Sequence, residues 1–121
     1  MTVAAAGEEP NYPPRDAYRP RRTCMSVPAS SERFLTRARD LPVDEVMLDL
    51  EDSVAPDAKP AARELAVAAL RAGGWADKLV AVRVNGAATP WAYRDVIAVA
   101  ESAGGAVDSL ILPKVSEPAA V

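Results

Sequence analysis

The sequence predicts an α/β protein built on a parallel sheet, and two observations carry this prediction. Short aliphatic runs of strand length alternate with longer segments of helical periodicity along the chain. The spacing between successive runs suits a helical crossover, which joins parallel strands. The predicted order is a strand followed by a helix, three times, and then a fourth strand.

Four strands and three helices are expected. The strands are 23–27, 46–50, 79–84 and 109–113, and the helices are 32–39, 59–72 and 91–102. The second helix is the clearest, because its apolar residues recur at helical spacing from Ala62 to Leu70 and Gly73 and Gly74 follow it. In the third helix, the pattern predicts that Tyr93, Val96, Ile97 and Ala100 face inward. Residues 116–121 resemble the start of a further helix.

Length and composition limit the possible functions. The chain has 121 residues, half of them hydrophobic, which is enough for one domain with a core. The net charge of -3 gives no reason to expect nucleic-acid binding, and no apolar run approaches the length of a membrane span. Histidine is absent, which excludes histidine-based catalysis and histidine-ligated zinc within this chain. Any metal held here would be a hard ion bound by oxygen.

The N-terminal residues and the single cysteine bear on domain organisation and location. Residues 1–20 are rich in alanine, proline and charge without periodicity, so we expect a disordered leader before a folded domain at 21–121. The first ten residues lack a basic segment and carry two glutamates, unlike a secretory signal. Cys24 cannot form an internal disulfide, which fits a reducing cytoplasm.

Three carboxylates, Asp49, Glu51 and Asp52, stand at the end of the second predicted strand. Alternation along a strand places Leu48 and Leu50 on one face and Asp49 and Glu51 on the other. A group of carboxylates at the carboxyl end of a parallel strand suits a ligand site. A solvated turn between strand and helix is the structural alternative, and the spacing does not decide between them.

Arg83 is the most informative single residue. It lies on the face of the third strand opposite the valines, where a guanidinium is costly unless it is paired. Its partner is either a structural carboxylate, Asp49 or Glu51, or a substrate carboxylate gripped by the planar fork, and both can hold at once. Lys114 follows the fourth strand, where a lysine is more often ordinary than catalytic.

Two arginines of the first helix, Arg33 and Arg37, lie four residues apart on one face. This helix starts beside the predicted site, so they could reach anionic phosphates, although two exposed surface arginines are the simpler interpretation. The chain contains no GxGxxG after its first strand, no GxxxxGK[ST] motif and no nucleophile elbow. The standard phosphate-loop and hydrolase interpretations are therefore not supported.

Five motifs, in order, resemble one known family. They are VPA at 27–29, VMLDLEDSVAPDAKPAAR at 46–63, VRVN at 82–85, TPWAYRDV at 89–96 and LILPKV at 110–115. On these motifs the sequence resembles the citrate lyase β-subunit-like (HpcH/HpaI aldolase) family, and within it the malyl-CoA/β-methylmalyl-CoA lyases. The resemblance covers nearly everything from Arg22 to Val121.

The resemblance implies a TIM (β/α)8 barrel, of which this chain supplies the first half as four parallel βα units. It implies Mg²⁺-dependent, reversible cleavage of a 3-hydroxyacyl-CoA such as malyl-CoA into an acyl-CoA and glyoxylate. It further implies trimers or hexamers for the full-length enzyme. A malyl-CoA thioesterase and a keto-acid aldolase that does not use CoA are the alternatives within the enzyme class.

The resemblance also assigns roles to individual residues. Arg83 is expected to hold the carboxylate or keto-acid end of the substrate, with Asp49 in the same part of the site. Glu51 and Asp52 are expected beside the metal and its waters, without being direct ligands. Position along the first strand and helix places the CoA contacts on Ser26, Arg33 and Arg37.

Chain length is the main departure from the family pattern. A full barrel needs about 250 residues, and the resemblance places the direct metal ligands and a catalytic acid in later strands. We therefore expect an N-terminal half that is inactive and marginally stable alone, because a half barrel exposes sheet edges. A non-catalytic truncated chain is a further alternative. A small flavodoxin-like domain fits the length but leaves the acids and Arg83 unexplained.

Overall fold

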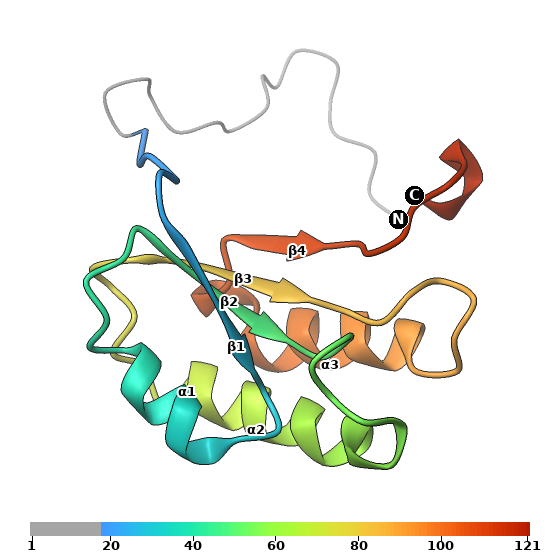
Figure 1. Ribbon diagram of the computed structural model, residues 1–121, viewed down its shortest axis with the longest axis horizontal. Helices are drawn as coiled ribbons and strands as arrows, with labels where there is room; N and C mark the ends of the chain where they lie inside the picture. The colour runs from blue at the N-terminus through green and yellow to red at the C-terminus, as the bar shows by residue number, and fades with distance from the viewer. Residues whose placement is uncertain (1–17) are drawn as a thin grey trace.

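Strands and helices alternate along the chain in the predicted order (Figure 1). The computed structural model describes residues 18–121. The strands are β1 (Cys24–Pro28), β2 (Glu45–Asp49), β3 (Leu79–Arg83) and β4 (Ser109–Ile111). The α-helices are α1 (Glu32–Ala38), α2 (Lys59–Arg71) and α3 (Ala92–Ala103). Short 3-10 turns are η2 (Pro56–Ala58), η3 (Gly104–Ala106) and η4 (Pro118–Ala120), the last lying where the start of a further helix was expected.

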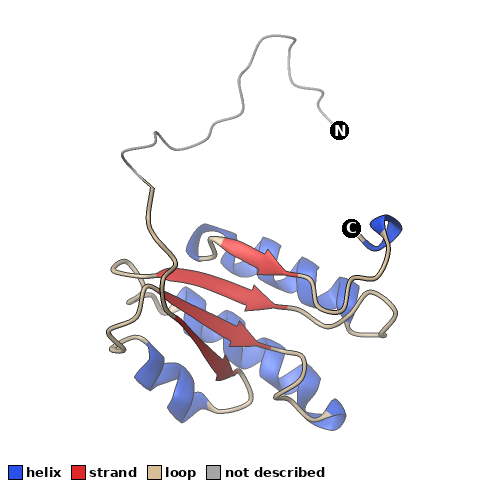
Figure 2. Ribbon diagram, turned by 45° about the horizontal axis from the view of Figure 1, so that its top comes forward, coloured by secondary structure: helices blue, strands red, loops and turns tan. Residues whose placement is uncertain are grey.

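The four strands form one parallel sheet in the order β1-β2-β3-β4, which confirms the predicted α/β class. In its register, Asp49 at the end of β2 pairs with Pro28 of β1 on one side and Arg83 of β3 on the other. The three α-helices lie on one face of the sheet (Figure 2). The opposite face carries no helix in the part of the chain that the structure describes. Because all four strands are parallel, their carboxyl ends share one rim.

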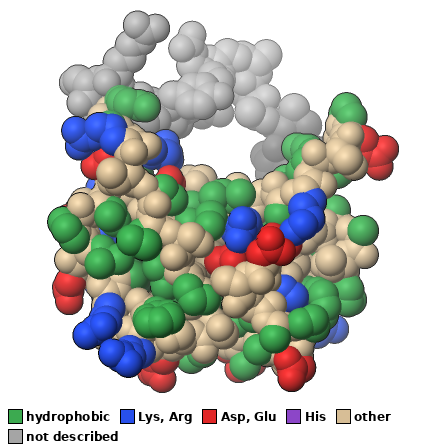
Figure 3. Space-filling view, viewed as in Figure 1, with side chains coloured by type: hydrophobic (Ala, Val, Ile, Leu, Met, Phe, Trp, Pro, Cys, Tyr) green, Lys and Arg blue, Asp and Glu red, His purple; other side chains and the backbone are tan. Residues whose placement is uncertain are grey.

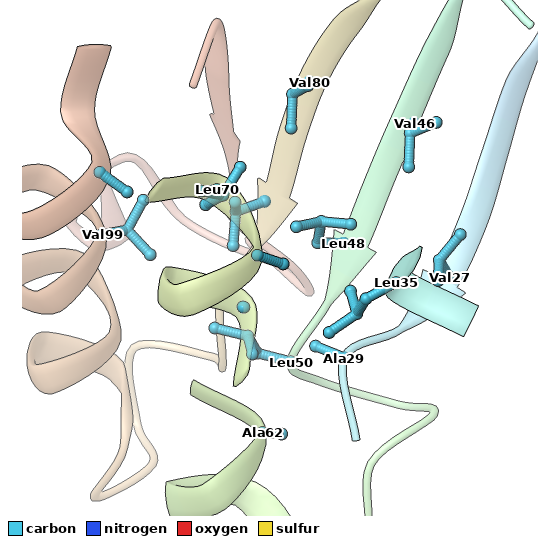
Figure 4. Packing of buried hydrophobic residues seen from close by; sticks show 14 of the residues in the cluster. Val27, Ala29, Leu35, Val46, Leu48, Leu50, Ala62, Leu70, Val80 and Val99 are labelled. Atoms are coloured by element: carbon cyan, nitrogen blue, oxygen red, sulfur yellow. The ribbon is translucent and has the colours of Figure 1, made fainter. Parts of the chain in front are cut away.

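The hydrophobic core lies between the sheet and its helices (Figure 4). Val46 and Leu48 occupy alternate positions of β2 and are fully buried, as strand periodicity predicts. Leu35 of α1, Leu70 of α2 and Val99 of α3 pack against the same face. Each such side chain contributes about 1.5–3 kcal/mol when fully buried, so this layer is the main support of the sheet.

Helix α3 turns a different side to the core from the one that its apolar pattern predicts. Tyr93 and Ile97 are 59% and 48% exposed, whereas Asp95 and Val99 are buried. Asp95 can lie inside because Arg63 of α2 donates a 2.8 Å hydrogen bond to its carboxylate, which offsets the loss of water. The prediction of inward-facing residues was wrong for Tyr93, Ile97 and Ala100, while Val96 is half-buried against the core.

The predicted leader lies mostly outside the described residues, which exclude 1–17. Residues 18–20 are exposed and belong to no strand or helix. Among the helices that the structure describes, none combines the length and the apolar character needed to cross a membrane.

Candidate functional site

The carboxyl rim of the sheet brings five charged side chains together. Asp49 ends β2 and Arg83 ends β3 at directly paired positions. Glu51 and Asp52 follow β2, and Lys114 follows β4. We call these five residues the rim cluster. Figure 3 shows acidic side chains flanked by basic ones at this place on the open face of the sheet. The structure thus joins Arg83 to the predicted acids, while their roles toward a substrate stay predictions.

Asp49 is the carboxylate that pairs with Arg83. The guanidinium donates from Nε to Oδ1 and from Nη2 to Oδ2, both at 2.8 Å, which is a bidentate pair. The Nε of Arg83 is 3.8 Å from the Glu51 carboxylate, so Glu51 is a weaker partner. The Asp49 side chain is fully buried, whereas that of Arg83 is 26% exposed. The guanidinium therefore remains open to solvent on one side.

Asp49 is held from several directions. Its carboxylate also accepts hydrogen bonds from the backbone N–H groups of Glu51 at 2.9 Å and Ser53 at 3.0 Å, and from the Ser53 hydroxyl at 2.6 Å. Burial is the largest influence on the pKa of Asp49 and raises it. The hydrogen bonds from Arg83, Ser53 and the Glu51 backbone together outweigh burial, so the pKa lies well below its ordinary value. Asp49 is thus a fixed negative charge.

Lys114 bridges the two remaining acids of the rim cluster. Its ammonium donates hydrogen bonds to Glu51 and, at 3.1 Å, to Asp52. The bond to Glu51 and then that to Asp52 raise the pKa of Lys114, and the same contact lowers the pKa of Asp52. Lys114 has φ of 52°, a left-handed conformation that is uncommon outside glycine. The expectation of an ordinary lysine missed this contact.

A buried lysine holds the loop that carries Glu51. Lys59 opens α2, is 7% exposed, and donates from Nζ to the carbonyls of Leu50 at 3.1 Å and Glu51 at 2.8 Å. Its Nζ also lies 5.3 Å from the centroid of the Trp91 ring. These partners replace water around the charge. The sequence offered one signal for this role, a lysine directly after an acidic loop at the start of a helix.

A second buried polar group fixes the chain after β3. Asn85, two residues beyond Arg83, donates to Asp95 from its backbone N–H at 2.9 Å and from Nδ2 at 2.7 Å. The other oxygen of Asp95 accepts the hydrogen bond from Arg63. This network anchors the carboxyl end of β3 to α2 and α3. Sequence analysis missed it because the apolar pattern of this helix did not include Asp95 among the inward-facing residues.

The three residues predicted to contact CoA make no hydrogen bond or ion pair with the rim cluster. Ser26 lies within β1 opposite Met47, and Arg33 and Arg37 are exposed on α1. Within residues 18–121, none of the three makes a side-chain hydrogen bond or ion pair. Ser26 and Arg37 line one hollow of about 300 Å³ beside β1, and Arg33 does not line it. Contact with CoA stays a prediction for all three.

The carboxylates of the rim cluster are the groups in this part of the structure that could face a metal ion or its waters. No group of three or more His, Cys, Asp or Glu side chains in residues 18–121 is arranged to hold a metal. Asp49 has both oxygens occupied by Arg83. Glu51 and Asp52 offer carboxylate oxygens at the rim, which can accept hydrogen bonds from the waters that Mg²⁺ usually keeps.

A parallel sheet in sequential strand order, with its helices on one face and its charged residues at the carboxyl rim, is the arrangement found in the (β/α)8 class of α/β proteins, in which sites form at that rim. Residues 22–121 match the family described as HpcH/HpaI aldolase/citrate lyase, and the chain belongs to this family. The resemblance noted from the sequence motifs is therefore confirmed.

Two curated relatives illustrate the range of activities in the family. The L-malyl-CoA/beta-methylmalyl-CoA lyase of Cereibacter sphaeroides strain ATCC 17025 is 42% identical over 103 residues, which are 85% of this chain and 32% of that protein. The (3S)-malyl-CoA thioesterase of strain KD131 is 40% identical over 100 residues, 83% of this chain and 34% of that protein. The chain spans about a third of the length of the curated relatives that it matches.

Solved structures match the same fold. The citrate lyase beta subunit from M. tuberculosis, complexed with oxaloacetate and magnesium, has a TM-score of 0.64 and 31% identity, with coverage of 81% of this chain and 40% of that one. CitE from Mycobacterium tuberculosis in complex with magnesium, acetoacetate and coenzyme A also has a TM-score of 0.64 and 31% identity, with coverage of 81% and 34%. The four strands thus correspond to part of a citrate lyase beta-like barrel.

Proposed function

We propose that residues 21–121 form the first half of a TIM-barrel lyase domain and supply the substrate-anion part of its active site. The reaction is Mg²⁺-dependent cleavage of a 3-hydroxyacyl-CoA of the malyl-CoA type into an acyl-CoA and glyoxylate. The relative named malyl-CoA lyase and the neighbours solved with magnesium and keto acids support this proposal. The observation that carries it is the Arg83 guanidinium, fixed on one edge by Asp49 and open on another.

Arg83 would bind the carboxylate of the substrate. Its hydrogen bonds to Asp49 use Nε and Nη2, and Nη1 makes none within residues 18–121. A guanidinium has five N–H donors, so donors remain for a planar carboxylate. In the cleavage direction, the same positive charge would stabilise the alkoxide whose electron pair forms the carbonyl of glyoxylate, while the electrons of the broken carbon–carbon bond pass to the acyl-CoA as its enolate.

Glu51 and Asp52 would provide negative charge beside Arg83. Bound Mg²⁺ supplies Lewis-acid polarisation of a substrate oxygen. The two carboxylates would accept hydrogen bonds from water at the rim and so orient it, a role that outer partners of metal sites have. Lys59 keeps the Glu51 backbone in place, and Lys114 donates hydrogen bonds to both acids.

We further propose that the 121-residue chain does not turn over by itself. It spans about a third of the length of its relatives, and the family resemblance assigns the direct metal ligands and the catalytic acid to later strands. An assay of Mg²⁺-dependent glyoxylate release from malyl-CoA should therefore give no signal with this chain. Robust turnover would overturn this part of the proposal.

A chimera tests the function itself. Residues 22–121 replace the matching segment of the C. sphaeroides lyase, and glyoxylate release is measured with Mg²⁺. We expect the chimera to retain lyase activity and its Arg83→Lys variant to lose about a hundredfold, because a point charge cannot reproduce the fork. Arg71→Lys, at the exposed end of α2, is the matched control. A folded chimera without activity, or an unaffected Arg83→Lys variant, would contradict the proposal.

A malyl-CoA thioesterase is the second candidate, because that relative is nearly as similar as the lyase. A chimera built in the thioesterase separates the two, since free CoA without glyoxylate marks hydrolysis. A CoA-independent keto-acid aldolase would turn over free hydroxy acids in the same assays. If neither chimera folds with residues 22–121, the result favours the alternative of a non-catalytic truncated chain.

Location and assembly are also proposals. A single cysteine, which cannot pair within the chain, supports a cytoplasmic protein. The trimer or hexamer that the family resemblance implies stays a prediction for the full-length enzyme, and sedimentation of the chimera would test it.

A further inference from the structure

The buried lysine at the start of α2 lies where a cation is costly. Lys59 is 7% exposed, and its partners are two carbonyl oxygens and the Trp91 ring. No carboxylate forms an ion pair with it within residues 18–121. Lys59 also lies in the first turn of α2, where the helix dipole disfavours positive charge. Because burial without a counter-ion and the helix dipole both oppose this ammonium, its role follows from what it holds.

The peptide group between Leu50 and Glu51 is held at both ends. Its carbonyl oxygen accepts a hydrogen bond from Nζ of Lys59 at 3.1 Å. Its N–H, which belongs to Glu51, donates to Oδ1 of Asp49 at 2.9 Å. A positive charge thus lies at the oxygen and a negative charge at the N–H. Both charges favour the same orientation of the peptide plane.

The same oxygen of Asp49 continues this connection to Arg83. Oδ1 also accepts the hydrogen bond from Nε of Arg83 at 2.8 Å. Three hydrogen bonds therefore run in series from Lys59, through one peptide group and Asp49, to the guanidinium. Hydrogen bonds in series polarise one another. The charge of Lys59 thus strengthens the bond that the peptide N–H makes to Asp49.

The backbone provides a second connection between Lys59 and Arg83. The N–H of Leu50 donates to the carbonyl of Arg83 at 3.0 Å, while Lys59 holds the carbonyl of Leu50 and, at 2.8 Å, that of Glu51. Trp91, which directly precedes α3, places its ring centroid 5.3 Å from the ammonium. Lys59 therefore ties the segments that follow β2 and β3 to one charge.

We propose that Lys59 is a positioning residue for Arg83. Its ammonium fixes the Leu50–Glu51 peptide, the peptide fixes Asp49, and Asp49 fixes the guanidinium. This inference rests on the proposed function, in which Arg83 binds the substrate anion. A guanidinium held in one orientation loses less freedom when a planar anion binds. Loss of Lys59 would therefore weaken anion binding although Lys59 itself does not touch the anion.

NMR of the 121-residue chain with ¹⁵N-labelled arginine tests the positioning without any ligand. The Nε–H signal of Arg83 is identified as the one that Arg83→Lys removes. We expect this proton to exchange slowly with water in the natural chain. Lys59→Met should speed its exchange about tenfold or more and move its signal toward those of exposed arginines, because the peptide can turn once its oxygen loses the cation. The backbone N–H of Glu51 should lose protection as well.

A second buried lysine supplies the matched control. Lys78 is 2% exposed, directly precedes β3 at the amino end of the sheet, and donates from Nζ to the carbonyl of Arg39 at 2.6 Å. Lys78→Met removes an equally buried charge and should leave the Arg83 signal in place. Lys59→Gln keeps an N–H donor without the charge and should give an intermediate loss of protection. Far-UV circular dichroism establishes that each variant is folded.

Several results would overturn the proposal. One is a natural chain, folded or unfolded, in which the Nε–H of Arg83 is not protected. Another is protection that Lys59→Met leaves unchanged, or that Lys78→Met removes to the same extent, since the latter marks a general loosening. If Lys59→Met does not fold, Lys59→Gln takes its place in the comparison. If neither folds while Lys78→Met does, Lys59 is a residue of the core and the proposal is wrong.

The lyase chimera separates this inference from the proposed function. Lys59→Met in the chimera should raise KM for malyl-CoA about tenfold, because a misplaced guanidinium meets the substrate poorly. Lys78→Met should leave KM unchanged. An active chimera whose KM does not respond to Lys59→Met would overturn the proposal. A folded but inactive chimera contradicts the proposed reaction instead, and the NMR comparison then still decides whether Lys59 positions Arg83.

Discussion

Replacing Asp49 by Asn is the sharpest test of how the rim cluster is built. Asp49 is fully buried and its carboxylate is paired with Arg83 through two hydrogen bonds of 2.8 Å. An amide of the same size keeps one acceptor oxygen but turns an NH₂ group toward a donor. The substitution therefore removes the charge, leaves the guanidinium without its partner and sets two donors against each other.

The expected loss of stability follows from burial. Removing one partner of a buried ion pair costs about 3–5 kcal/mol when the other charge is left without solvent. Arg83 is 26% exposed, so water can reach it and the loss should lie nearer about 2–3 kcal/mol. Replacing both partners, as Asp49→Leu with Arg83→Met, should cost less than Asp49→Asn alone, because no unpaired charge remains.

Urea unfolding at pH 7 measures this loss. The emission of Trp75, which is 5% exposed, reports on unfolding, and all variants are compared at one protein concentration. Asp44→Asn is the control, because Asp44 forms an exposed pair with Arg22 and should lose far less. If Asp49→Asn and Asp44→Asn were equally stable, the rim pair would not hold the sheet together in the way described.

Three further predictions concern the same rim. Since the pKa of Asp49 is lower in the folded chain than its ordinary value of 3.8, its contribution is fully present above about pH 4 and is lost as pH falls through the folded-state pKa. The unfolding free energy of the natural chain should thus fall more steeply below pH 4 than that of Asp49→Asn, and parallel curves would contradict the assignment. Lys59→Met should cost about 1–2 kcal/mol in urea, because two carbonyls lose a charged donor; a more stable variant would show that burying this charge outweighs its hydrogen bonds. Lys114→Gly should have a higher unfolding midpoint than Lys114→Ala, since φ of 52° suits glycine, and the reverse order would show that the backbone rearranges.

The meeting of Asp49 and Arg83 was predictable because it needs only two short-range rules. Strand alternation assigns each residue to a face, and parallel pairing brings the ends of neighbouring strands to one rim. Both residues end their strands, so an error of one residue in register would still have left them close. The order of strands and helices followed in the same way from the periodicity of apolar residues.

The contacts that sequence analysis missed depend on tertiary distance. Lys114 reaches Glu51 and Asp52 from the far side of β3, across a separation of more than sixty residues. Asp95 is buried because Asn85 and Arg63 of α2 donate hydrogen bonds to it. The residue pattern of its own helix does not reveal these two donors. Hydrophobic periodicity ranks residues by solvent preference and cannot register a carboxylate whose partners lie on other elements.

The guanidinium of Arg83 is immobilised before any anion arrives. An arginine side chain carries about 2 kcal/mol of rotamer entropy, and the bidentate grip of Asp49 removes much of it during folding. A ligand that reaches the free edge of the fork therefore does not have to order a mobile side chain. Small, rigid anions with two coplanar oxygens would benefit most from a receptor of such fixed shape.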